Sequence, residues 1–170
     1  MINVESIDQT AKSMILPNGD WNEVNALKIS SDELIMIMKK YTNMGLTLYV
    51  GSDSMLNSDH CTFSCIVAVH CNKLCIASYY FQKQKLYEQK YRHLEKKILK
   101  EVDIAIKTAN YLKEQIPKAN IEVHIDIGEK EKNATRHLAE NAKGWVKGMG
   151  YDVKVKPNSW ASSVADWHTK

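Results

Sequence analysis

The order of strand-like and helix-like segments constrains the fold of this chain more than any other feature of its sequence. Apolar residues that alternate with polar ones predict strands, and apolar residues spaced by three and four predict helices. Three strands come first, and helices and strands then alternate, so we expect an α/β fold with a mixed sheet of five strands flanked by helices. The expected strands cover residues 46–54, 61–69, 74–81, 121–127 and 151–156, and the expected helices cover 88–115, 133–147 and 159 onward.

The region before residue 46 carries one clear element, a helix that begins after Ser30. Glu33 follows Ser30 by three residues, which fits a capping box at a helix N-terminus. We therefore expect residues 1–45 to form an N-terminal extension with a helix that packs on the core. Residues 46–170 are then expected to form the main domain.

Length and composition favour a single domain with a substantial core. The chain has 170 residues, of which 44% are hydrophobic. It contains no run of about 18 apolar residues, and its first residues lack the basic flank and apolar core of a secretory signal. We therefore expect a cytoplasmic protein with no membrane partner. The sequence leaves the oligomeric state open.

Four cysteines lie close together in the sequence, at Cys61, Cys65, Cys71 and Cys75. Four thiolates can form a tetrahedral zinc site. The spacing here differs from paired C-x2-C knuckles, however, and the residues between the cysteines resemble apolar strands. The favoured interpretation is therefore buried, reduced thiols that pack as small apolar side chains.

Basic residues are distributed unevenly along a chain that is nearly balanced in charge. There are 23 Lys and Arg against 20 Asp and Glu, which gives a net charge of +3. Lys and Arg are frequent in residues 83–100, and Lys154, Lys156 and Lys170 follow near the end. Such a distribution permits a polyanion-binding surface, but a solvated helix face is the favoured explanation.

Two aspartates are expected to meet on neighbouring strands. Asp53 follows the apolar residues of the first strand, and Asp126 lies near the end of the fourth. In the expected sheet these strands are parallel central neighbours, so their carboxyl ends lie side by side. Either aspartate alone is also explained as a turn former at a strand end. The pair indicates a site for a hard cation such as Mg²⁺ or Mn²⁺.

A carboxylate cluster for phosphoryl chemistry needs more than two acids. Glu101 shares the apolar stripe of its helix, so it is a better third ligand than Glu95 or Asp103. A fourth acid lies on the polar face of the C-terminal helical segment. The candidate catalytic and metal-binding residues are Asp53, Asp126, Glu101 and Asp166.

Other polar residues near these acids are candidates for contact with a nucleic-acid backbone. His124 shares the strand face of Asp126, which suits proton transfer or phosphate contact, although packing in the core or the sheet is the favoured interpretation. The candidate substrate-binding residues are Ser54, His124, Lys156, Ser162, Ser163 and Lys170.

Three motifs give this chain a resemblance to a known family. They are YVGSDS at 49–54, HIDIG at 124–128 and KVKPNSWASSVADWHTK at 154–170, and KNATR at 132–136 accompanies them. With these motifs, the chain resembles the YkuK-type family of predicted ribonuclease H-like nucleases from about residue 46 to its end. The resemblance implies a ribonuclease H-like fold, metal-dependent nuclease activity, and Asp53 and Asp126 as metal ligands.

Two functions therefore remain open at the level of sequence. The leading hypothesis is a metal-dependent nuclease that acts on RNA, DNA or a hybrid. The alternative is a catalytically weak or inactive ribonuclease H-like module that binds nucleic acid or a protein. A phosphotransferase related to actin-like ATPases is disfavoured, because the chain is half the size needed and has no second glycine-rich phosphate loop.

Overall fold

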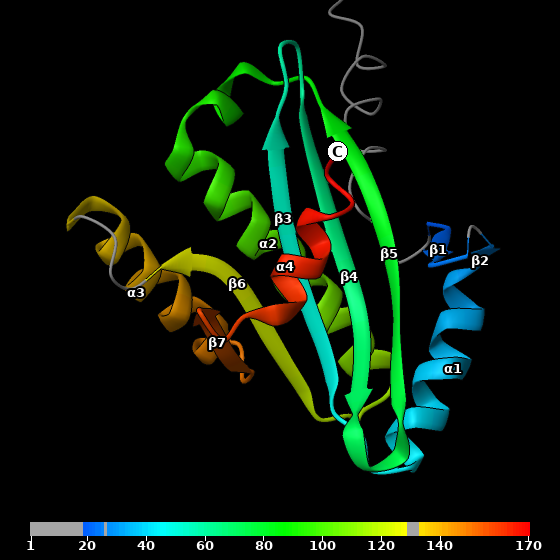
Figure 1. The fold of residues 1–170 in the computed structure, drawn as a ribbon. Coiled ribbons are helices and arrows are strands. Elements are labelled where there is room, and N and C mark those ends of the chain that lie inside the picture. Colours follow the sequence, from blue (N-terminus) through cyan, green and yellow to red (C-terminus); the bar gives the residue numbers. More distant parts are fainter. Residues whose placement is uncertain (1–18, 26, 129–132) are drawn as a thin grey trace, which may run out of the picture.

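The computed structural model describes residues 19–25, 27–128 and 133–170, and for residues 133–135 it describes the backbone alone. These residues form one sheet with helices on both faces (Figure 1). The strands of these residues are β1 (Trp21–Glu23), β2 (Lys28–Ile29), β3 (Leu48–Leu56), β4 (Cys61–Cys71), β5 (Ile76–Leu86), β6 (Ile121–Gly128) and β7 (Asp152–Lys156). The helices are α1 (Ser31–Asn43), α2 (Leu94–Gln115), α3 (Asn133–Gly148) and α4 (Trp160–Asp166), and the 3₁₀ turns are η3 (Asn72–Leu74) and η4 (Gln89–Arg92).

The strands of the described residues form one mixed sheet in the order β2-β1-β5-β4-β3-β6-β7. β3, β4 and β5 make an antiparallel meander, and β6 pairs in parallel with both β3 and β7. The five expected strands are β3 to β7, so the predicted α/β class and mixed sheet are confirmed. The sheet is larger than expected, because β1 and β2 from the N-terminal extension add to the edge beside β5.

Apolar side chains pack on both faces of the sheet. On one face, α1, α2 and α3 share a large core cluster with Leu48 and Val50 of β3. On the other face, Ala161 and Ala165 of α4 form a smaller cluster with Ile66 of β4. Figure 1 shows α4 crossing in front of β3 and β4, with α2 behind them. Successive residues of β3 therefore face different helices.

Among the element boundaries that differ from those expected, two lie near the candidate acids. β3 continues to Leu56 because β4 still pairs with it there, so Asp53 lies inside a strand rather than at its end. α2 begins only at Leu94. The η4 turn before it buries Tyr91 against Phe63, with the ring centroids 5.1 Å apart. This packing holds the segment on the sheet, where the helical pattern alone predicts more helix.

The predicted capping box of α1 is confirmed. Ser30 Oγ accepts a hydrogen bond of 3.2 Å from the N–H of Glu33, and the N–H of Ser30 donates to Glu33 Oε2 at 2.7 Å. Leu34 and Met38 of this helix, and Trp21 of β1, are buried in the large core cluster. These contacts join part of the N-terminal extension to the sheet.

Some parts of the chain named in the sequence analysis lie outside the described residues. They are residues 1–18 of the extension and part of the KNATR segment at 132–136. In the ranges that are described, none of the helices combines the length and the apolar character needed to cross a lipid bilayer.

Candidate functional site

The parallel pairing of β3 with β6 brings the two strand aspartates together. Ser52 is in register with Ile125, so Asp53 and Asp126 are the next residues along the two strands. Strand alternation turns both side chains toward the face that α4 covers. The predicted side-by-side placement of the two aspartates is therefore present, although Asp53 does not end its strand.

Asp53 is buried in negative surroundings. Its residue is only 7% exposed, and its Oδ1 accepts a hydrogen bond of 2.7 Å from the N–H of Ser54. Burial is the largest cause that raises the pKa of Asp53 to about 6, and repulsion from Asp126 is the next; the hydrogen bond from Ser54 opposes the shift, and Asp166 raises it by less, with a small opposing effect of Lys97. The folded protein thus holds this carboxylate in surroundings that have too little positive charge to balance it.

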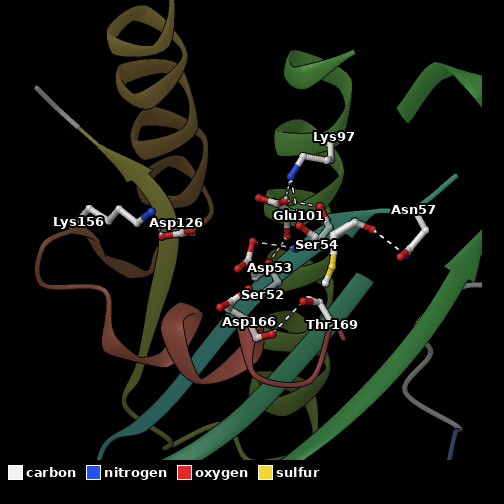
Figure 2. Close-up of polar contacts among 11 residues, drawn as sticks. Ser52, Asp53, Ser54, Asn57, Lys97, Glu101, Asp126, Lys156, Asp166 and Thr169 are labelled. Carbon is white, nitrogen blue, oxygen red and sulfur yellow. Dashed lines mark hydrogen bonds and ion pairs between the residues drawn. The ribbon is translucent and has the colours of Figure 1, made fainter. Parts of the chain in front are cut away.

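Glu101 reaches the same region from α2, on the other side of β3 (Figure 2). It is 2% exposed, accepts a hydrogen bond of 2.5 Å from Ser54 Oγ and lies 3.4 Å from Lys97 Nζ. Burial is the largest cause that raises the pKa of Glu101 to about 7; Lys97 opposes this shift and Asp53 adds to it. Ser52 Oγ also donates to the Glu101 carbonyl oxygen at 2.6 Å, which fastens α2 to β3.

The other two acids of α2 are not placed in this way. Glu95 is exposed. Asp103 forms ion pairs with Lys100 and Lys107, at 3.2 and 2.9 Å. The buried position of Glu101 therefore agrees with its preference over these two residues.

The fourth acid, Asp166, is brought to β3 by the close docking of α4. A Cβ on Gly51 would lie 2.4 Å from the backbone carbon of Ala161, so only glycine allows this approach. The N–H of Ala161 also donates to His124 Nδ1 at 3.0 Å. Asp166 is half-buried, and Thr169 Oγ1 donates to its carbonyl oxygen at 2.8 Å.

Asp126 already has a basic partner. Lys156 Nζ, from the neighbouring strand β7, lies 2.8 Å from Asp126 Oδ1 (Figure 2). The side chain of Lys156 is 49% exposed, so solvent screens this ion pair in part. Lys156 therefore lies near the candidate acids and forms an ion pair with Asp126. Its contact with substrate stays a prediction.

Three of the candidate substrate-binding residues are buried and already hydrogen-bonded. Ser54 Oγ donates to Glu101, and Ser162 Oγ donates to the Ser159 carbonyl at 2.7 Å. His124 is fully buried, and its Nε2 lies 2.8 Å from Glu122 Oε1 while its Nδ1 accepts from α4. Direct phosphate contact by these three side chains stays a prediction, because each already has a partner within the protein; the burial of His124 fits its packing in the sheet. Ser163 and Lys170 are exposed, as such a contact requires.

The donor set fits a hard cation in chemistry, because carboxylate oxygens are the ligands of Mg²⁺ and Mn²⁺. The repulsion that raises the pKa of Asp53 also marks a place where a cation is favourable. Among the described residues, however, no three His, Cys, Asp or Glu side chains are arranged as a ready metal site. The side chains of Asp53, Asp126, Glu101 and Asp166 therefore contribute negative charge to one region, but they do not form a complete coordination shell.

The cysteines do not gather into a zinc site in the described residues. Cys61 and Cys65 are buried in the core, Cys71 is half-buried and Cys75 is exposed. Burial raises the pKa of the Cys65 thiol to about 12, which opposes the thiolate form that zinc requires. The interpretation as buried strand thiols holds for the first two.

Two residues of the site were not identified from the sequence, Ser52 and Lys97. Ser52 lies with Ser54 on the apolar face of β3, and buried hydroxyls there require hydrogen-bond partners. Lys97 precedes Glu101 by four residues, the spacing of helical ion pairs. Both signals were present in the sequence.

Comparison with known proteins gives two matches. The family model described as Ribonuclease H-like matches residues 30–170. The chain is also 25% identical to the "Uncharacterized protein YkuK" of Bacillus subtilis (strain 168), in an alignment that covers 82% of this chain and 88% of that protein.

Proposed function

Because this chain belongs to the Ribonuclease H-like family, we propose that it is a divalent-metal-dependent nuclease that hydrolyses phosphodiester bonds of nucleic acid. The family match confirms the resemblance indicated by the sequence motifs, and it supports a nuclease-like module. The observation that carries the proposal is the burial of Asp53 beside Asp126, which the parallel pairing of β3 with β6 brings about; their repulsion contributes to the raised pKa of Asp53. A cation between these acids would relieve their repulsion.

In this proposal the four acids hold Mg²⁺ or Mn²⁺. Such an ion supplies Lewis-acid stabilisation of the scissile phosphate and a more acidic bound water. The N–H of Ser54 fixes the orientation of the Asp53 carboxylate. Ser54 Oγ and Lys97 Nζ fix that of Glu101. The exposed residues Ser163 and Lys170 are proposed to contact the nucleic-acid backbone.

A cleavage assay tests this proposal. Wild-type protein is incubated with Mn²⁺ and a panel of single-stranded, duplex and hybrid nucleic acids. We expect cleavage by the wild type and by Asp152→Asn, whose carboxylate is exposed at the start of β7, but none by Asp53→Asn. Cleavage that survives in Asp53→Asn, or the absence of any cleavage by the wild type, contradicts the proposal.

A second candidate function is supported by the lysine contacts of the site. Lys156 pairs with Asp126, and Lys97 pairs with Glu101, so two of the four carboxylates are partly neutralised by the protein itself. A module that binds nucleic acid or a protein without catalysis would have this property. Nucleic-acid binding that depends on salt, but not on EDTA or on Asp126→Asn, favours this function.

A further inference from the structure

A cavity of about 450 Å³ opens beside the carboxylates, between the β3–β4 hairpin, β5 and the C-terminal turn. Its walls carry three lysines and a histidine, together with neutral polar residues, and no acid. The wall residues used in the argument are Asn57, His60, Lys83, Lys85, Thr169 and Lys170.

The lysines of this cavity are exposed and come from strand and turn, not from the basic helix. Lys83 and Lys85 alternate along β5 and therefore project to the same face of the sheet. Lys83 Nζ donates to the main-chain oxygen of Lys170 at 3.0 Å, which leaves two of its three N–H groups for other acceptors. The acid of the rim is Asp59, which is exposed and bonded to His60 Nδ1 at 2.6 Å. The cavity wall thus suits an anionic ligand.

An exposed aromatic ring stands next to the cavity. Tyr87 is 61% exposed, and its ring lies 5.4 Å from that of His60, centroid to centroid. His60 is itself held by Asp59 and lies 3.3 Å from Asn57 Nδ2. A solvent-facing ring on a fixed support can stack on the face of a base, which is available in a single strand but covered inside a duplex.

The cavity lies a short distance from Asp53 across the sheet. Asp53 is in register with Ser64 of β4, and Ser64 is in register with Lys83 of β5. Since neighbouring strands are about 4.8 Å apart, the backbones of Asp53 and Lys83 are separated by roughly 10 Å. Thr169 of the cavity wall also donates to the Asp166 carbonyl oxygen. A chain of a few nucleotides spans such a distance.

We propose that this cavity holds the phosphate backbone of a single-stranded nucleic acid while Tyr87 stacks on one of its bases. The inference rests on the proposed function, and it deepens it: the substrate of the nuclease is a single strand rather than a duplex. Lys83 and Lys85 neutralise phosphates, and the strand extends from them toward the acids.

Binding is measured with Asp53→Asn protein, so that the nucleic acid stays intact. Fluorescence anisotropy follows a short labelled single strand, as RNA and as DNA, and the corresponding duplexes over a range of salt concentrations. The test background is combined with Lys83→Gln/Lys85→Gln, and the matched control is Lys39→Gln/Lys73→Gln, two lysines exposed on α1 and η3. A second pair of variants is Tyr87→Ala and Tyr87→Phe.

The single strand is expected to bind more tightly than its duplex. The Lys83→Gln/Lys85→Gln change should reduce the slope of log K against log salt by about 1.4, because each neutralised phosphate of a single strand contributes about 0.7. Tyr87→Ala should weaken binding roughly 5- to 150-fold, the usual range for one stacked base, while Tyr87→Phe retains it.

Three results overturn the inference: a duplex that binds as tightly as the single strand, an equal loss in the two lysine pairs, or no loss in Tyr87→Ala. The proposed function can fail separately. If the wild type cleaves nothing but the lysine-dependent binding of single strands persists, the nuclease proposal fails and the binding site stands. If the wild type cleaves but Lys83 and Lys85 have no effect, only the binding site fails.

Discussion

At the scale of single residues, Asp53 shows that an ionised carboxylate in the candidate site lowers the stability of the fold. The pKa of its carboxyl is about 6 in the folded protein, against 3.8 for an aspartate in water. Between these values the native state binds more protons than the unfolded state, so the free energy of unfolding falls as pH rises. Above pH 6 the ionised carboxylate costs the fold roughly 3 kcal/mol.

Asp53→Asn should therefore stabilise the protein at neutral pH. The amide keeps an oxygen for the N–H of Ser54 but carries no charge. We expect its advantage over the wild type, in urea unfolding with EDTA present, to be small near pH 4 and to approach roughly 2 to 3 kcal/mol near pH 7.5. The exposed Asp152→Asn serves as the control. An advantage that does not grow with pH would show that burial and repulsion do not raise the pKa of Asp53.

Lys156 offers a second test at this scale. Its Nζ lies 2.8 Å from Asp126 Oδ1, so a cation bound at Asp126 must share that carboxylate with a positive charge. Lys156→Gln should raise the affinity for Mn²⁺ at least about fivefold, since two unit charges 4 Å apart in water already interact by about 1 kcal/mol. Free Mn²⁺ measured by electron paramagnetic resonance reports the affinity.

The matched control for this test is Lys154→Gln on the same strand, because Lys154 is exposed. It should leave the Mn²⁺ affinity close to that of the wild type. Equal affinities in Lys156→Gln and the wild type would mean that Asp126 is not a metal ligand.

The sequence predicted the acids better than their partners. The helical spacing of apolar residues places Glu101 in the buried stripe of its helix, and the order of the strands places Asp53 beside Asp126. The hydrogen bonds of Ser54 depend instead on which face of β3 meets α2, a tertiary contact that the local pattern does not contain. For this reason the sequence predicts Ser54 as a substrate contact but does not reveal its hydrogen bond to Glu101.

At the scale of elements, α4 depends on one small residue beneath it. Gly51 has no side chain, and an added Cβ would come within 2.6 Å of the backbone nitrogen of Ser162. Backbone atoms cannot turn aside as a flexible side chain can, so Gly51→Ala must displace the helix. We expect a loss of roughly 1 to 3 kcal/mol in the free energy of unfolding and a matching loss of the proposed nuclease activity, because Asp166 moves with α4.

Gly144→Ala is the matched control for this change. Gly144 lies within α3, and a Cβ there meets nothing within 4 Å. Alanine in a helix interior should stabilise the protein by roughly 0.5 to 1 kcal/mol. Thermal melts of both variants check the pair, and a Gly51→Ala protein as stable as the wild type would contradict the close docking.

Element boundaries were the least predictable part of the fold. Helical spacing extends back before Leu94, but the burial of Tyr91 against Phe63 keeps that stretch out of α2. Likewise, pairing with β4 extends β3 beyond Asp53. In both cases packing between distant segments overrides a local preference.

At the scale of the whole molecule, the order of elements was enough to predict the mixed sheet. A meander of three strands followed by two helix–strand units leaves few ways to place parallel strands beside the first one. What the pattern could not reveal is the extra pairing of β1 with β5, because β1 and β2 are only 3 and 2 residues long. Strands this short do not show the alternation of polar and apolar residues by which a strand is predicted.

The N-terminal region supplies core side chains, so we expect a fragment of residues 46–170 to lose cooperative unfolding. The fragment would lack four buried side chains of the large cluster, each worth roughly 1.5 to 3 kcal/mol. Their sum is comparable to the whole stability of a typical domain, about 5 to 15 kcal/mol. The missing side chains are Trp21, Leu34, Ile35 and Met38.

Circular dichroism melts measure this prediction. A fragment of residues 19–170, which keeps all four side chains, is the control and should unfold cooperatively. A cooperative transition in the 46–170 fragment at a temperature near that of the full chain would instead make the extension an accessory to an independent domain.

The two outer strands of the described sheet also affect how the molecule meets its own copies. β2 has 2 residues, and β7 has 5, among them Lys154 and Lys156. A short edge offers few unpaired backbone groups, and a row of lysines repels a second row brought against it. Fibrous growth by strand addition at these edges is therefore disfavoured, even though the middle of the sheet is rich in the β-branched residues that such growth requires.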